Sequence, residues 1–154
     1  MFSSWGFSWG GWLDNRRGEW WLMGQMLLIG AHLLPRWPQL SSLGFARWPW
    51  QLSLIGALFV LAGLTLAVQA FVSLGSSLSP LPEPKEGNQL VSSGAYKRCR
   101  HPMYLAVLLC SLGVALGVGS LFHLLLFLLL VVVLGGKARR EERILLELHP
   151  DYAS

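Results

Sequence analysis

The residues best suited to chemistry lie in one short stretch, LVSSGAYKRCRHPMY, which runs from Leu90 to Tyr104. A residue before proline avoids the helical conformation, and proline suits the first position of a helix. The stretch therefore predicts a helix that begins at Pro102, with Arg100 and His101 at its N-terminus. Free backbone N–H groups and positive charge at such an end can bind an anion. The alternative is an ordinary basic patch that contacts lipid phosphates.

Two adjacent carboxylates, Glu141 and Glu142, form the second group of candidate residues. On their own they are also consistent with i,i+4 ion pairs on a solvated helix. However, the apolar block over residues 103–134 is interrupted by Gly117 and Gly119, which predicts a tight helical hairpin. A hairpin returns to the side it left, so His101 and a carboxylate are expected to face each other. Such a site suits a zwitterionic or cationic cofactor beside an apolar substrate.

The remaining histidines and cysteines give weaker signals. His32 and His123 lie within apolar segments without a carboxylate or second histidine at ligand spacing, so we expect them to form hydrogen bonds between helices. Cys99 and Cys110 are expected to be free thiols. No residues have the spacing of a metal site, a phosphate-binding loop or a dinucleotide fingerprint.

The composition identifies the surroundings of these residues. Of 154 residues, 53% are hydrophobic and only 13% are charged, against about 25% charged in soluble domains. The mean hydropathy is +0.49. This excludes a disordered chain or a disulfide-stapled miniprotein, argues against a soluble enzyme, and predicts an integral membrane protein. The net charge of +4 comes from basic residues at the ends of apolar runs, which argues against nucleic-acid binding.

The predicted fold is a single all-α membrane domain over residues 1–154, with about four transmembrane helices, a tight hairpin among them, and a cytoplasmic C-terminal amphipathic helix. The expected elements are helices over 19–34 and 50–74, a cytoplasmic cofactor loop over 75–101, hairpin arms over 102–118 and 120–136, and a C-terminal helix over 137–149. The first helix is short for a full span. In the second, Gly56 and Gly63 permit another helix to approach closely.

Charge predicts the topology of these helices. Lysines and arginines cluster both before and after the hairpin, within 85–100 and 137–143. Both clusters lie on one side of the membrane because the hairpin returns there. The positive-inside rule makes that side cytoplasmic, together with the N-terminus.

The stretch LVSSGAYKRCRHPMY followed by KARREERILLELHPDY resembles the membrane methyltransferases related to isoprenylcysteine carboxyl methyltransferase and the phospholipid methyltransferases. The resemblance covers about residues 75–152, and both motifs occur in the family's order around a hairpin. It implies S-adenosylmethionine as methyl donor, bound on the cytoplasmic face. It also implies a lipophilic acceptor, such as a prenylcysteine-like carboxylate, a lipid amine or a small hydrophobic thiol or acid. The acceptor would enter from the lipid bilayer, between the second helix and the hairpin.

The resemblance also implies roles for individual residues. Carried over by position, the cofactor-binding residues are Asn88, Gln89, Leu90, Val91, Tyr96, His101, Pro102, Met103, Tyr104 and Glu141. The implied catalytic residues are Arg100, Arg139 and Glu142, and the implied substrate contacts are Lys137 and Arg140. Lys137 stands where the family has an arginine, and Glu142 is the alternative to Glu141 if the alignment slips by one residue. Tyr96 or Tyr104 can stabilise a sulfonium by a cation–π contact.

The sequence departs from the family at its end, because relatives continue past Asp-Tyr with a further tail, whereas this sequence ends at Ser154. Two alternatives stay open. One is a non-catalytic membrane scaffold or partner protein that retains the fold. The other is a nicotinamide-dependent enzyme similar to sterol reductases, although those carry Trp-Trp in place of Ala95-Tyr96 and Asn in place of Pro102. Binding of S-adenosylmethionine, of a nicotinamide, or of neither distinguishes the three classes.

Overall fold

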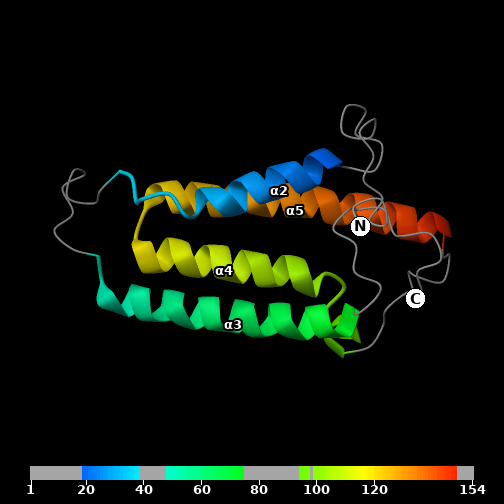
Figure 1. The fold of residues 1–154 in the computed structure, drawn as a ribbon, viewed down its shortest axis with the longest axis horizontal. Helices are drawn as coiled ribbons and strands as arrows, with labels where there is room; N and C mark the ends of the chain where they lie inside the picture. Colours follow the sequence, from blue (N-terminus) through cyan, green and yellow to red (C-terminus); the bar gives the residue numbers. More distant parts are fainter. Residues whose placement is uncertain (1–18, 39–47, 75–93, 98, 149–154) are drawn as a thin grey trace, which may run out of the picture.

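The chain is helical throughout the part that the computed structural model describes, which comprises residues 19–38, 48–74, 94–97 and 99–148. The elements are α2 (Glu19–Ala31), α3 (Trp50–Leu74), the short 3-10 helix η4 (Gly94–Lys97), α4 (Pro102–Val118) and α5 (Leu121–Leu148) (Figure 1). No strand occurs among these residues. The all-helical fold class is confirmed.

Two of these helices are long and apolar enough to cross a membrane: α3 over its whole length and α5 over Leu121–Glu147. Few of their side chains are buried, unlike those of a core helix in a soluble protein. Exposed leucines of α3 include Leu54, Leu58, Leu61 and Leu64. Only two of the four predicted spans therefore meet the length of a full crossing. The other two are shorter, since α4 has 17 residues and α2 has 13, or about 20 Å of helix.

A tight turn at Gly119 joins α4 to α5, as the glycine spacing predicts. Gly119 adopts a left-handed conformation (φ 64°, ψ 51°), and its N–H donates to the Ala115 carbonyl. The indole of Trp48 covers the turn, because a Cβ on Gly119 would lie 2.5 Å from the Trp48 ring. Trp48 Nε1 also donates to the Leu116 carbonyl over 2.7 Å. This bond satisfies a carbonyl that the helix end leaves without a partner, which apolar surroundings require.

Small residues bring the backbones of α3 and α4 together. A Cβ on Gly56 would lie 2.5 Å from the Gly113 carbonyl oxygen, and a Cβ on Gly63 would lie 2.8 Å from that of Ala106. The close approach expected at Gly56 and Gly63 is confirmed.

Two predicted boundaries differ from the structure. The helix expected over 19–34 ends at Ala31 and continues as tight i→i+3 turns, with Leu34 N–H donating to the Ala31 carbonyl. The arm expected over 120–136 and the C-terminal helix expected over 137–149 are one helix, α5. The lysine, arginines and glutamates that follow Gly136 are strong helix formers, so the change from apolar to charged residues does not interrupt the helix.

The helices lie side by side in the order α2, α5, α4 and α3 (Figure 1). The beginnings of α2 and α4 lie at the same end of the molecule as the end of α3 and the charged part of α5. Histidine and serine side chains tie the helices together toward the other end. His32 Nε2 lies 2.6 Å from Ser111 Oγ, and His123 Nε2 lies 3.3 Å from the His32 carbonyl oxygen. These contacts confirm the interhelical role predicted for both histidines.

The glycine contact between α3 and α4 gives a direct test of the packing. We expect Gly63→Ala to destabilise the protein by about 1–3 kcal/mol, because its methyl group overlaps backbone atoms that cannot move aside. The matched control is Gly30→Ala in α2, where no described atom lies within 4 Å of the added Cβ. Thermal unfolding in detergent measures both variants. Equal midpoints for the two would contradict this packing.

Candidate active site at the open end of the hairpin

At the open end of the hairpin, His101 connects the beginning of α4 to α5. It precedes Pro102, the first residue of α4, and its backbone (φ −127°, ψ 61°) lies outside the helical region. Its carbonyl accepts the first hydrogen bond of the helix, from Leu105 N–H. Its imidazole makes no capping bond to α4. The ring is therefore directed to α5, where Nε2 lies 3.0 Å from Glu142 Oε1.

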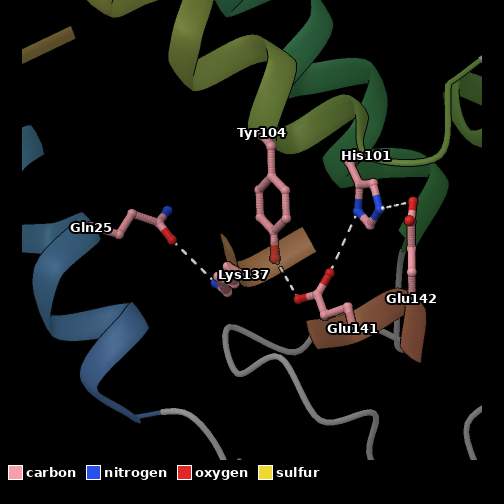
Figure 2. Close-up of polar contacts among 6 residues, drawn as sticks. All are labelled: Gln25, His101, Tyr104, Lys137, Glu141 and Glu142. Carbon is pink, nitrogen blue, oxygen red and sulfur yellow. Dashed lines mark hydrogen bonds and ion pairs between the residues drawn. The ribbon is translucent and has the colours of Figure 1, made fainter. Parts of the chain in front are cut away.

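Two residues contact Glu141, one on each carboxylate oxygen: Tyr104 of α4, and His101, the N-cap residue of that helix (Figure 2). His101 Nδ1 lies 3.5 Å from Oε2, and the Tyr104 hydroxyl donates a hydrogen bond to Oε1. The rings of His101 and Tyr104 stack in parallel, with centroids 5.3 Å apart. The two donors thus form one rigid aromatic pair that orients the carboxylate. The sequence prediction that the hairpin brings His101 and a carboxylate face to face is confirmed.

The two carboxylates also set the protonation of their neighbours. Burial alone lowers the pKa of His101, but hydrogen bonds to Glu141 and Glu142 and their negative charge outweigh it, so the pKa is raised. The pKa of the Tyr96 phenol is raised as well, first by burial and then by the charges of Glu141 and Cys99. The raised pKa favours the protonated, positively charged form of His101, and Tyr96 keeps its proton at neutral pH.

The 3-10 turn η4 holds Tyr96 next to this group. Gly94 has a left-handed φ of 60°, and a Cβ there would lie 2.2 Å from Ser73 Oγ at the end of α3. Because Gly94 lacks that atom, the next backbone N–H, that of Ala95, donates to Ser73 Oγ over 3.2 Å. The glycine of the Gly-x-Tyr motif thus attaches the turn to α3 and places Tyr96 near the carboxylates.

A buried cation lies on the other side of Tyr104. Lys137 is only 3% exposed, and its Nζ lies 5.1 Å from the centroid of the Tyr104 ring. The same Nζ donates to Gln25 Oε1 of α2 over 3.1 Å. One chain of contacts therefore runs from α2 through Lys137, Tyr104 and Glu141 to His101 (Figure 2).

This arrangement can bind a ligand that carries both polar groups and positive charge. The carboxylate of Glu141 is an acceptor for an ammonium or a hydroxyl, and charge assistance strengthens such bonds. An aromatic face attracts cations, and Tyr104 already has the Lys137 ammonium over its ring.

Comparison with known protein families shows which family the chain belongs to. Residues 52–151, which include nearly all of α3 and the whole hairpin, match the model of a family described as phospholipid methyltransferase. The chain belongs to the phospholipid methyltransferase family. No match was found among curated proteins or among solved structures. The resemblance to membrane methyltransferases is confirmed, and membership indicates a membrane-associated methyltransferase in general terms.

The residues to which the resemblance gave roles in this family fall into three groups. Eight lie at the open end of the hairpin: Tyr96, His101, Pro102, Met103, Tyr104, Lys137, Glu141 and Glu142. Arg100 and Arg139 are exposed, whereas Arg140 is half-buried. Residues 88–91 lie outside the described part of the chain. Their functional roles remain predictions.

Helical geometry explains why Lys137 is buried on the face of α5 that carries Glu141, whereas Arg139 is exposed. Lys137 and Glu141 are four residues apart and share one face of α5. Arg139, two positions from each, lies on the opposite side of the helix. Of the two carboxylates, Glu141 is the better placed for a ligand, because it contacts both His101 and Tyr104 and its side chain is 18% exposed, against 36% for Glu142.

Sequence reasoning missed Gln25, which lies outside the matched residues 52–151 of the phospholipid methyltransferase family. A signal was available, since Gln25 is the one amide side chain of α2 and interrupts an otherwise apolar run. Its partner could not be read from the sequence, because Lys137 is 112 residues away.

The raised pKa of His101 predicts a pH-dependent contribution to stability. A protonated His101 stabilises the fold fully below the unfolded value of 6.5, and this contribution is lost as the pH rises through the higher folded pKa. We expect the unfolding midpoint of wild type to exceed that of His101→Gln most at about pH 6 and progressively less toward about pH 9. Thermal unfolding in detergent at several pH values measures the difference. A difference that grows with pH would show that the folded pKa is not raised.

Proposed function

We propose that the protein is an S-adenosylmethionine-dependent methyltransferase of the membrane that methylates a lipophilic acceptor. The observation that carries this proposal is the Glu141 carboxylate, oriented by His101 and Tyr104 at the open end of the hairpin. Phospholipid methyltransferase family members generally use this cofactor. The site offers acceptor oxygens and aromatic faces, which match the cationic and hydroxyl groups of S-adenosylmethionine.

Named residues would hold different parts of that cofactor. Glu141 would accept hydrogen bonds from its ammonium or ribose hydroxyls. Tyr96 would place an aromatic face beside the sulfonium, because the Tyr104 ring already stacks on His101 and has the Lys137 ammonium over it. When bound, S-adenosylmethionine supplies an electrophilic methyl group. The protein's contribution is then to align donor and acceptor and to exclude water, which the apolar parts of α4 and α5 support.

The proposed orientation puts the site on the cytoplasmic face. The described basic residues of the hairpin's open end are Lys97, Arg100, Lys137, Arg139, Arg140 and Arg143. Arg36 is the described basic residue toward the other end. The positive-inside rule favours the cytoplasm for the end with more positive charge. We propose that the acceptor reaches this end from the bilayer, with its polar group near Lys137.

Equilibrium binding of S-adenosylmethionine to the purified protein in detergent tests the function. We expect saturable binding that Glu141→Gln weakens about tenfold or more, because a hydrogen bond to a charged group is worth about 1.5–3 kcal/mol. The matched control is Glu147→Gln, which removes an exposed carboxylate from the same helix and should leave the affinity unchanged.

The alternatives give different results in the same experiment. Binding of NADPH but not S-adenosylmethionine would support the reductase-like alternative. A folded protein that binds neither would be a scaffold. Equal affinities for wild type and Glu141→Gln would leave the cofactor but refute the assignment of Glu141.

A further inference from the structure

Ser73, in the last turn of α3, uses its hydroxyl both as a donor and as an acceptor. The hydroxyl donates to the Gln69 carbonyl over 2.7 Å, a bond that serine and threonine often make inside helices. Because its one proton is directed to that carbonyl, the oxygen remains an acceptor. The N–H of Ala95 donates to this oxygen over 3.2 Å. The Ser73 hydroxyl thus gives η4 a fixed point on α3.

The turn η4 is held at both of its ends. At its start, Gly94 lies so close to Ser73 that an added Cβ would be 2.2 Å from the hydroxyl oxygen. Beyond its end, the N–H of Cys99 donates to the Ala95 carbonyl over 3.3 Å, and α4 begins three residues later. Tyr96 is therefore fixed between the end of α3 and the start of α4.

This placement brings the Tyr96 side chain to the candidate site. Tyr96 is half-buried, and after burial the negative charge of Glu141 is the largest cause of the raised pKa of its phenol. The two side chains are thus close enough to interact. Tyr104, which also contacts Glu141, already has its ring stacked on His101 and an ammonium over it. Tyr96 is the ring that the proposed function assigns to the sulfonium.

We propose that Ser73 is a positioning residue for the cofactor, whose hydroxyl holds η4 against α3 so that the Tyr96 ring stands beside Glu141 at the sulfonium of S-adenosylmethionine. This inference rests on the proposed function and adds α3 to the elements that build the site. Ser73 acts through Tyr96 and not on the cofactor itself. A serine that only stabilised the fold would change the affinity equally with and without the Tyr96 ring.

The tyrosine content of the chain makes the test specific. The full sequence has three tyrosines, Tyr96, Tyr104 and Tyr152. In full-length protein labelled with meta-fluorotyrosine and purified in detergent, the ¹⁹F resonance of Tyr96 is the one lost in Tyr96→Phe. This resonance reports the surroundings of the ring without any ligand. The dissociation constant of S-adenosylmethionine is measured on each variant by isothermal titration.

We expect Ser73→Ala to shift the Tyr96 resonance of the ligand-free protein. It should also weaken S-adenosylmethionine binding about two- to tenfold, the factor that corresponds to a typical hydrogen bond. Ser73→Thr keeps the hydroxyl and should restore both the resonance and the affinity. In a Tyr96→Leu background, which lacks the ring, Ser73→Ala should have no further effect on the affinity.

Thr65→Ala is the matched control. The Thr65 hydroxyl donates to the Leu61 carbonyl over 2.8 Å, so this variant loses the same kind of bond from the same helix. Thr65 lies about two turns before Ser73 on α3. The Tyr96 resonance and the affinity for S-adenosylmethionine should both equal those of the wild type.

Three results would overturn the proposal while the proposed function stands: a Tyr96 resonance that Ser73→Ala does not move, an unchanged affinity in Ser73→Ala, or an equal loss of affinity with and without the Tyr96 ring. The last would indicate a purely structural role. If Ser73→Ala does not fold, Gly94→Ala, which disrupts the same contact from the side of η4, takes its place. Failure of the wild type to bind S-adenosylmethionine would refute the proposed function and this inference with it.

Discussion

The left-handed turn at Gly119 is the constraint on which the candidate site depends. It reverses the chain within two residues, so α5 returns along α4 and residues about forty positions apart in sequence come into contact. The turn is possible because Gly119 has no Cβ to collide with Trp48. The Trp48 indole then satisfies a carbonyl at the end of α4. A larger residue at this position would both strain the backbone and displace the indole. It would also shift α5 relative to α4, and with it the contacts between His101 and Glu141.

The open end of the hairpin concentrates charge where the helices leave the apolar region. Two carboxylates, a histidine and a buried lysine lie on adjacent turns of α4 and α5, and each is paired. Glu141 has His101 and Tyr104, Glu142 has His101, and Lys137 has Gln25. Unpaired charges of this kind are costly in a low-dielectric setting. The pairing orients these groups and offsets their loss of water, which a site for a charged cofactor beside an apolar substrate requires.

Much of the hairpin and its packing could be predicted from the sequence, because the residue patterns that indicate them are local. His101-Pro102 marks a helix start, the glycines mark a turn, and Gly56 and Gly63 mark a close helix contact. Each follows from backbone sterics. The boundary predicted at Lys137 is wrong, because α5 continues through Gly135 and Gly136 into residues that are strong helix formers, and a change in polarity alone does not end a helix. The contact of Gln25 with Lys137 depends on how α2 docks on α5, which no local pattern encodes.

The most direct test of the central claim, that Glu141 and Tyr104 form one cofactor-binding unit across the hairpin, is a double-mutant cycle. The dissociation constant of S-adenosylmethionine is measured for wild type, Tyr104→Phe, Glu141→Gln and the double variant. If Tyr104 acts by orienting Glu141, its hydroxyl has no role once the carboxylate is gone, so the double variant should bind about as weakly as Glu141→Gln alone, with a coupling energy of about 0.5–3 kcal/mol. Additive effects, or no effect of either substitution, would contradict the account.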